Sequence, residues 1–393
     1  MINALGFVVL GLLTRMLGPD GFGQYSTVYA FLFFVAIVAD MGLGTLATRE
    51  ISHDGADEAR ILGQFFTLRL CLVFGASILG IIAVFFFPYP FVVKVGVIVA
   101  SAAIVAQSLI QVLMGTFQKH LRIFVVAVGD VVTRLIQLAG LVILFWRGIG
   151  LLVPVLVVNI AAESVHLWYM IIFARRIVPF TISVDIDYWK RTLKNALPIA
   201  LSLVFTLLYF KIDTIMLSIM RPPADVGVYS VAYKVLEVII FFPAMYVGLI
   251  MPLLSRHSKE PDEFKAVFQK TFRILALGAV LSILGLLIFS NPIISLIGGN
   301  EFVDSAMVLR ILSLAAGLIF LGNLGGNAII ALNIQKQGMW IYAVGAVFNI
   351  AANLVFIPKY GYLAAAWTTV ATELLVTVWM FWLIRRKLIV SSG

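Results

Sequence analysis

The sequence has little of what proteins use for redox, metal or phosphate chemistry. Cys71 is the only cysteine among 393 residues, and only four residues are histidine. A single cysteine excludes an internal disulfide and a thiolate metal site, and the scattered histidines form no cluster with metal-ligand spacing. No Ser-His-Asp set can be assembled, and no glycine-rich P-loop is present. We therefore expect no metal, no cofactor, no ATP site and no enzyme activity.

Charged residues are also scarce, at 12% of the chain, whereas hydrophobic residues make up 62% and the mean hydropathy is +1.08. A soluble domain has about 45–50% apolar and about 25% charged residues. Apolar stretches of about 20 residues recur along the whole length, as in helices that cross a bilayer, and they lack the alternation of a β-barrel. We expect an all-α membrane protein with about twelve transmembrane helices, at residues 1–17, 26–47, 61–87, 91–116, 123–146, 149–173, 197–220, 227–254, 272–290, 305–332, 339–357 and 361–384.

Lysine and arginine are distributed unequally between the loops on the two sides of these spans. Eighteen of them lie in one set of loops and in the C-terminal tail, and four lie in the opposite set. By the positive-inside rule the first set is cytoplasmic, so both chain termini should be cytoplasmic too. The net charge of +9 therefore reflects loops that meet anionic lipid headgroups, and we expect no nucleic-acid partner.

Two related turn sequences divide the chain into similar halves. Residues 15–26 read RMLGPDGFGQYS and residues 221–230 read RPPADVGVYS, each between two apolar spans. Proline and glycine favour a tight turn in both. Because six spans, an even number, precede the midpoint, the halves should form a parallel repeat. We expect a six-helix lobe at 1–173, a cytoplasmic linker at 174–196, and a second six-helix lobe with a basic tail at 197–393.

Two segments leave their interpretation open. Residues 183–194 combine Tyr188 and Trp189 with three basic residues, which fits either a short interfacial helix at headgroup depth or a plain linker helix. The chain also begins inside an apolar span at Met1, with no polar lead-in and no signal-peptide cleavage pattern. We expect the first helix to be shortened by a late start or a truncation.

Charged residues inside the spans are the candidates for function, because a bilayer tolerates them only beside water or a partner. In the second half, Lys211 and Asp213 lie in one span, and Lys234 and Glu237 lie in the next. Lys234 and Glu237 share a helix face. These four residues could form a cationic wall with balancing acids in a water-filled cavity. Alternatively, they could pair and stabilise helix contacts only.

A second group of in-span charges lies in the first half, toward the cytoplasmic side. The acids Asp40, Asp130 and Glu163 are candidates for binding a proton or a sodium ion during ion coupling. Nearby arginines favour plain ion pairing instead. Asp130 and Arg134 are spaced i,i+4 on one helix face, so we expect them to pair. Asp40 and Arg69 lie at matching depth on successive helices.

Residues 13–26 (LTRMLGPDGFGQYS), 40–52 (DMGLGTLATREIS), 211–217 (KIDTIML) and 226–237 (VGVYSVAYKVLE) resemble one known family. It is the polysaccharide-transporter branch of the multidrug/oligosaccharidyl-lipid/polysaccharide (MOP) flippase superfamily, and the resemblance covers nearly the whole chain. The resemblance implies two six-helix lobes around a central cavity that opens alternately to each side. The first two helices of each lobe line that cavity in the family. This implies a substrate-binding role for Arg15, Lys211, Asp213, Lys234 and Glu237.

The resemblance also implies a function. We expect flipping of a polyprenyl diphosphate-linked oligosaccharide across the cell membrane, coupled to a gradient of H+ or Na+, since a cationic cavity would offset the diphosphate charge. A multidrug/cation antiporter of the same superfamily is the alternative, although acids and aromatics would suit it better than Lys211 and Lys234. A membrane glycan polymerase or transferase is a third candidate, and the absence of a large extramembrane loop argues against it.

Overall fold

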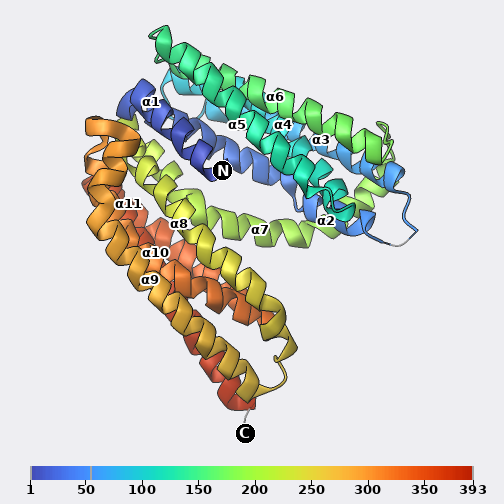
Figure 1. Ribbon diagram of the computed structural model, residues 1–393, viewed down its shortest axis with the longest axis vertical. Coiled ribbons are helices and arrows are strands. Elements are labelled where there is room, and N and C mark those ends of the chain that lie inside the picture. The colour runs from blue at the N-terminus through green and yellow to red at the C-terminus, as the bar shows by residue number, and fades with distance from the viewer. Residues whose placement is uncertain (1, 54, 392–393) are drawn as a thin grey trace. The chain divides into compact units, whose positions relative to one another are not determined.

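The computed structural model describes the backbone of residues 2–53 and 55–391, and the side chains of these residues except 2–4, 198–210 and 389–391. Met1, on which the expectation of a shortened first helix rests, lies outside the described residues. Helices account for nearly all of the described chain, as Figure 1 shows. The chain divides into two compact units, unit 1 at residues 1–207 and unit 2 at residues 208–393.

Unit 1 is a bundle in which the helix α4 is central. α4 packs against α1, α2, α3 and α6, and α5 packs against α6 and α1. Two apolar clusters fill the bundle, and both include buried residues of α3 and α4. The helices of unit 1 are α1 (Ile2–Asp40), α2 (Leu43–Ile51), α3 (Glu58–Val84), α4 (Phe91–Lys119), α5 (Ile123–Trp146) and α6 (Leu152–Ile177).

Unit 2 is built around α10, which packs against α8, α9 and α11. One long helix, α7, runs from unit 1 across the boundary at residue 207 into unit 2. The elements are α7 (Ile186–Met220), α8 (Pro223–Arg256), α9 (Pro261–Gly298), the short 3-10 helix η1 (Gly299–Phe302), α10 (Asp304–Ala331) and α11 (Gln335–Ser391).

Single glycines break two of these helices. Gly18 has φ +63° inside α1, and Gly361 has φ +57° inside α11. Residues with side chains rarely adopt this conformation, and Pro19 then begins the next helical segment with its φ already fixed. The expected turn at 15–26 is therefore shorter than the sequence indicated, since only Gly18 of this segment has non-helical backbone angles.

The helix count confirms the expected all-α membrane architecture. Nine helical stretches in the described residues are long and apolar enough to cross a membrane. Two of them contain the breaks at Gly18 and Gly361, so these breaks divide the stretches into eleven helical segments, close to the expectation of about twelve spans. The chain is thus a multi-pass α-helical membrane protein.

The segment between the halves differs from both expected forms. Residues 186–196 are neither a separate interfacial helix nor a plain linker, because they form the beginning of α7. Tyr188, Trp189 and Leu193 pack against the core of unit 1 rather than facing outward. Ala196 is fully buried in the same core. This packing gives the helix a buried face from its first turn.

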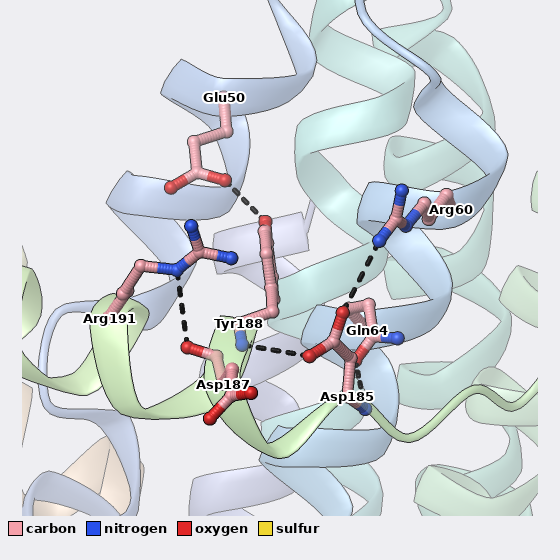
Figure 2. A network of polar contacts seen from close by, with 7 residues as sticks. All are labelled: Glu50, Arg60, Gln64, Asp185, Asp187, Tyr188 and Arg191. Atoms are coloured by element: carbon pink, nitrogen blue, oxygen red, sulfur yellow. Dashed lines mark hydrogen bonds and ion pairs between the residues drawn. The ribbon is translucent and has the colours of Figure 1, made fainter.

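Polar contacts hold the start of α7 on α2 and α3 (Figure 2). Asp185 accepts a hydrogen bond from the backbone N–H of Tyr188 at 3.0 Å and an ion pair from Arg60 at 3.3 Å. The backbone N–H of Asp185 donates to Gln64 at 3.1 Å, and the Tyr188 hydroxyl donates to Glu50. The Tyr188 N–H and Arg60 favour the charged carboxylate, and they hold the pKa of Asp185 below its ordinary value.

Candidate functional site

A buried carboxylate in unit 2 is held entirely by neutral groups. Asp213 of α7 is 3% exposed. Its Oδ2 accepts hydrogen bonds from the hydroxyls of Tyr229 at 3.2 Å and Thr369 at 2.8 Å, and its Oδ1 accepts from the Asn353 amide at 2.6 Å. Among the ion pairs of the described residues, none involves Asp213. A buried carboxylate without a cation is costly, so this arrangement suits a group that takes up a proton or a small cation.

A small pocket adjoins Asp213 within unit 2. It is lined by Asp213, Tyr233, Ile319, Asn349, Thr369, Thr372 and Glu373. Glu373 of α11 is 7% exposed, so a second carboxylate lies in the same buried surroundings. Asn353 Oδ1 is buried without a hydrogen-bond partner, although its amide nitrogen donates to Asp213 and to Asn349. The pocket therefore offers carboxylate, hydroxyl and amide oxygens, the ligands that hard cations prefer.

Two lysines share the carboxylate of Glu237, which lies one turn after Tyr233 on α8. Glu237 forms ion pairs with Lys211 of α7 through Oε1 and with Lys234 through Oε2, the latter at 2.7 Å. The Lys211 ammonium also lies 4.9 Å from the centre of the Tyr233 ring, in a cation–π contact. The cluster Lys211–Lys234–Glu237 therefore carries one excess positive charge. Because all three side chains are partly exposed, an anion from outside can approach them.

The structure brings together only some of the five predicted substrate-binding residues. Lys211, Lys234 and Glu237 form the cluster just described, whereas Asp213 turns to its own neutral donors. From the sequence, either Asp213 or Glu237 could pair with each lysine. In the structure Glu237 pairs with both. Arg15 is exposed on α1 in unit 1, three residues before the break at Gly18.

The in-span acids of unit 1 have different surroundings. Asp40 forms an ion pair with Arg69 at 2.6 Å, which confirms the match in depth that the sequence indicated. Arg69 is 1% exposed and donates further to the Ala39 carbonyl, Ser108 and Gln111. All of these contacts join α1 to α3 and α4. The arrangement supports the structural interpretation of Asp40, since a fixed cation already neutralises it.

The predicted pair of Asp130 and Arg134 is wrong. Arg134 instead donates to Gln137 at 2.9 Å, on the next turn of α5, and no ion pair joins it to Asp130 in the described structure. Glu163 of α6 accepts a hydrogen bond from Gln107 of α4 at 3.0 Å. The three acids proposed for ion coupling thus do not share a partner.

Sequence reasoning missed several residues of the unit 2 pocket. Glu373 and Arg310 are in-span charges, so the same criterion that selected Lys211 could have found them. Arg310 of α10 does not line the pocket and donates to Ser290 of α9 at 2.9 Å. Thr369 and Asn353 carry no such signal, because polar residues of this size are common between membrane helices.

The fold and the family matches together define a multi-pass membrane protein of the MOP flippase type. The model of a family described as "Polysaccharide biosynthesis protein" matches residues 1–258, and the MatE model matches residues 198–355. The chain therefore belongs to the polysaccharide biosynthesis protein family, within the MOP flippase superfamily.

Individual proteins agree with this assignment. The chain is 23% identical to a Haloferax volcanii protein described as "Probable low-salt glycan biosynthesis flippase Agl15", over 95% of this chain and 78% of that protein. Its fold matches a solved structure of the lipid II flippase MurJ with TM-score 0.80 at 14% identity, over 100% of this chain and 89% of that one. It matches an inward-facing multidrug resistance MATE transporter with TM-score 0.81 at 12% identity, over 100% and 96%.

Proposed function

We propose that the protein is a flippase that carries a polyprenyl diphosphate-linked oligosaccharide across the cell membrane by alternating access, driven by a gradient of Na+ or H+. The observation that carries this proposal is the excess positive charge of the cluster Lys211–Lys234–Glu237. Membership of the family and similarity to a protein described as a glycan biosynthesis flippase support it.

The lysine cluster suits a diphosphate for a physical reason. A diphosphate must lose much of its water to enter a membrane protein, and charge-assisted hydrogen bonds from ammonium groups offset that loss. Lys211 and Lys234 already lie together on Glu237, so little ordering is needed to bind an anion. Arg15 in unit 1 remains a proposed further contact to the phosphates. The polyprenyl chain can stay in the lipid while the sugars remain hydrated.

The buried carboxylate Asp213 is the acid best suited to the coupling cation. Of the acids proposed from the sequence, Asp40 already has Arg69 as its cation. Asp213 has only hydroxyl and amide donors, and the adjoining pocket contains Glu373 as a second acid. Asp130 and Glu163 stay candidates for a second proton or sodium site in unit 1.

A multidrug/cation antiporter is the second candidate function. The match of the MatE model to residues 198–355 and the two acids of the unit 2 pocket favour it. The two candidates differ in the charge of the substrate. A flippase of the proposed kind binds an anionic lipid at the lysines, whereas the antiporter binds an organic cation at acids and aromatic rings.

Binding to the purified full-length protein in nanodiscs separates these candidates. Farnesyl diphosphate is the anionic probe, farnesol its uncharged analogue, and ethidium the cationic probe. We compare the wild type with Lys211→Gln/Glu237→Gln, which keeps the excess charge on Lys234, and with Lys211→Gln/Lys234→Gln/Glu237→Gln, which is neutral. Lys234 is 51% exposed, so its charge can remain hydrated in the first variant, and the second variant keeps no charge of the cluster; both should therefore fold.

The neutral variant should bind farnesyl diphosphate at least about 10-fold more weakly than the variant that keeps Lys234, because a hydrogen bond to a charged group contributes about 1.5–3 kcal/mol. Lys336→Gln/Lys359→Gln removes two exposed lysines of unit 2 and should bind like the wild type. Equal binding by the charged and neutral variants would remove the lysines from the site. Wild-type binding of ethidium without farnesyl diphosphate would favour the antiporter.

The proposed orientation puts both termini in the cytoplasm and Asp225, at the start of α8, outside. After replacement of Cys71 by serine, single cysteines at Asp225 and Asp187 can be labelled with a membrane-impermeant maleimide in intact cells. Only the cysteine at Asp225 should react before lysis, and reaction of both or of the Asp187 position alone would contradict this topology.

A further inference from the structure

One face of α8 connects the buried carboxylate with the lysine cluster. Tyr229, Tyr233 and Glu237 follow one another at i,i+4 spacing, so they lie above one another on this face. The rings of Tyr229 and Tyr233 stack with centres 5.6 Å apart and an interplanar angle of 29°. Both tyrosines are buried, and Tyr233 is 7% exposed. The three side chains therefore form a continuous packed row inside unit 2.

The two ends of this row contact the two candidate sites. At one end the Tyr229 hydroxyl donates to Asp213 Oδ2. At the other end Glu237 holds Lys211 and Lys234. Tyr233 lies between them and belongs to both sites, since it lines the pocket beside Asp213 and its ring lies 4.9 Å from the Lys211 ammonium.

We propose that Tyr233 is the positioning residue that couples occupation of the Asp213 pocket by a cation to binding of the diphosphate at Lys211. This inference rests on the proposed function, because it deepens the relation between its two sites. In this proposal Tyr233 does not bind the phosphates itself. Its ring positions the Lys211 ammonium, which binds them.

The physical basis is that the Tyr233 ring lines the pocket and also contacts the Lys211 ammonium. Because the Tyr233 ring lines this small pocket, we expect a cation bound there to push the ring away from the Lys211 ammonium. A weaker cation–π contact leaves Lys211 more available to phosphate. The cation and the diphosphate should therefore strengthen each other's binding.

The charged groups around Tyr233 are few, which makes the coupling testable. Asp213 and Glu373 face the pocket, and Lys211, Lys234 and Glu237 form the cluster at its other side. A purely electrostatic coupling would pass through space between these groups and would not need the ring. The ring-dependent account predicts that removing the ring uncouples the two sites while the five charges remain.

The experiment measures the dissociation constant of farnesyl diphosphate for the full-length protein in nanodiscs at low and high cation. One arm compares 1 mM and 100 mM Na+ at constant pH and ionic strength, and the other compares pH 8 and pH 6 without Na+. We compare the wild type with Tyr233→Phe, which keeps the ring, and Tyr233→Leu, which removes it. Phe241→Leu removes an exposed ring of the same helix and serves as the control.

In the arm to which the wild type responds, its affinity should rise by about 10-fold or more, within the usual range for coupled sites. Tyr233→Phe and Phe241→Leu should keep this change within about 2-fold, whereas Tyr233→Leu should reduce it to about 2-fold or less while retaining binding at low cation. By reciprocity, farnesyl diphosphate should strengthen Na+ or proton binding by the same factor in each variant.

Two results would overturn the inference. One is a wild type that binds farnesyl diphosphate with the same affinity in both arms at low and high cation. The other is a Tyr233→Leu protein that keeps the full change, because the coupling would then pass through space. Absence of wild-type binding to farnesyl diphosphate under every condition is a different outcome, and it contradicts the proposed function itself.

Discussion

Two tyrosine pairs occupy matching places in the two units, and they meet different polar groups. Tyr25 and Tyr29 follow the first turn sequence, and Tyr229 and Tyr233 follow the second. In unit 1 both hydroxyls accept hydrogen bonds from the Asn159 amide, at 3.2 and 3.0 Å. In unit 2 the pair meets a carboxylate and an ammonium instead. The repeat thus supplies one scaffold twice, and the second copy brings its tyrosines into direct contact with Asp213 and Lys211.

The in-span acids Asp40 and Asp213 of the two units differ in the same way. Asp40 in unit 1 faces the guanidinium of Arg69, whereas Asp213 in unit 2 faces hydroxyls and an amide. A carboxylate with its own arginine is a structural cross-link between helices. A carboxylate with neutral donors can change its charge state or bind a cation without losing a partner. We therefore propose a structural role for the Asp40–Arg69 pair and a transport role for Asp213.

The largest effect should come from breaking the ion pair of unit 1. Arg69→Gln should lower the free energy of unfolding by about 1.5–3 kcal/mol, because the helices lose the buried guanidinium that hydrogen-bonds the half-buried Asp40 carboxylate. Arg60→Gln is the matched control on the same helix, since Arg60 is exposed and its pair with Asp185 is at the surface. It should cost less than about 1 kcal/mol.

Thermal unfolding of the purified variants measures this difference. Asp40→Asn/Arg69→Gln should recover part of the loss, since no unpaired charge remains. Equal destabilisation by Arg60→Gln and Arg69→Gln would show that the Arg69 pair has no special weight in unit 1.

The next effect separates the two acids by function. Asp213→Asn should fold normally and lose the response of transport or binding to the coupling cation, a response of about 10-fold in the wild type. Asp40→Asn should unfold more easily and keep that response. We measure two properties of each variant, the cation dependence of farnesyl diphosphate binding and the thermal unfolding. The opposite pattern would mean that unit 1 holds the coupling acid.

The smallest effect concerns the anchor of α7 on unit 1. The pKa of Asp185 is lowered in the folded protein by the Tyr188 N–H, so its carboxylate favours folding at neutral pH and loses that contribution as the pH falls through its folded-state pKa. Asp185→Asn should unfold at a slightly lower temperature than the wild type at pH 7. The gap should close as the pH falls below about 4. A gap of constant size over this range would leave Asp185 without a role in the anchor.

The sequence predicted the helices well because membrane spans depend on local hydropathy alone. Residues 123–146 form α5 with the expected bounds, and the first turn sequence contains the break at Gly18. The pair of Asp40 and Arg69 could be predicted too, since each charge in lipid needs a partner at its own depth. These features require no knowledge of how the helices are rotated.

The partners within the site could not be predicted because they depend on helix rotation and on contacts between distant segments. Asn353 reaches Asp213 across 140 positions of the sequence, and no local pattern selects this pair among other polar residues. The failed prediction for Asp130 has the same cause. The i,i+4 spacing permits a pair with Arg134 but does not require it, and Arg134 donates to Gln137 instead. The linker was misjudged because packing on unit 1 extends α7 by residues that look amphipathic alone.

We propose that the lysines of unit 2 bind a lipid-linked glycan and that Asp213 couples its translocation to a cation gradient. The most direct test is translocation of a fluorescent polyprenyl diphosphate oligosaccharide in proteoliposomes, with and without an imposed Na+ or H+ gradient. Wild-type protein should flip the lipid faster with a gradient, Asp213→Asn should ignore the gradient, and Lys211→Gln/Lys234→Gln/Glu237→Gln should not flip it, although all three are well folded. Gradient-driven flipping by the neutral variant at the wild-type rate would contradict the account.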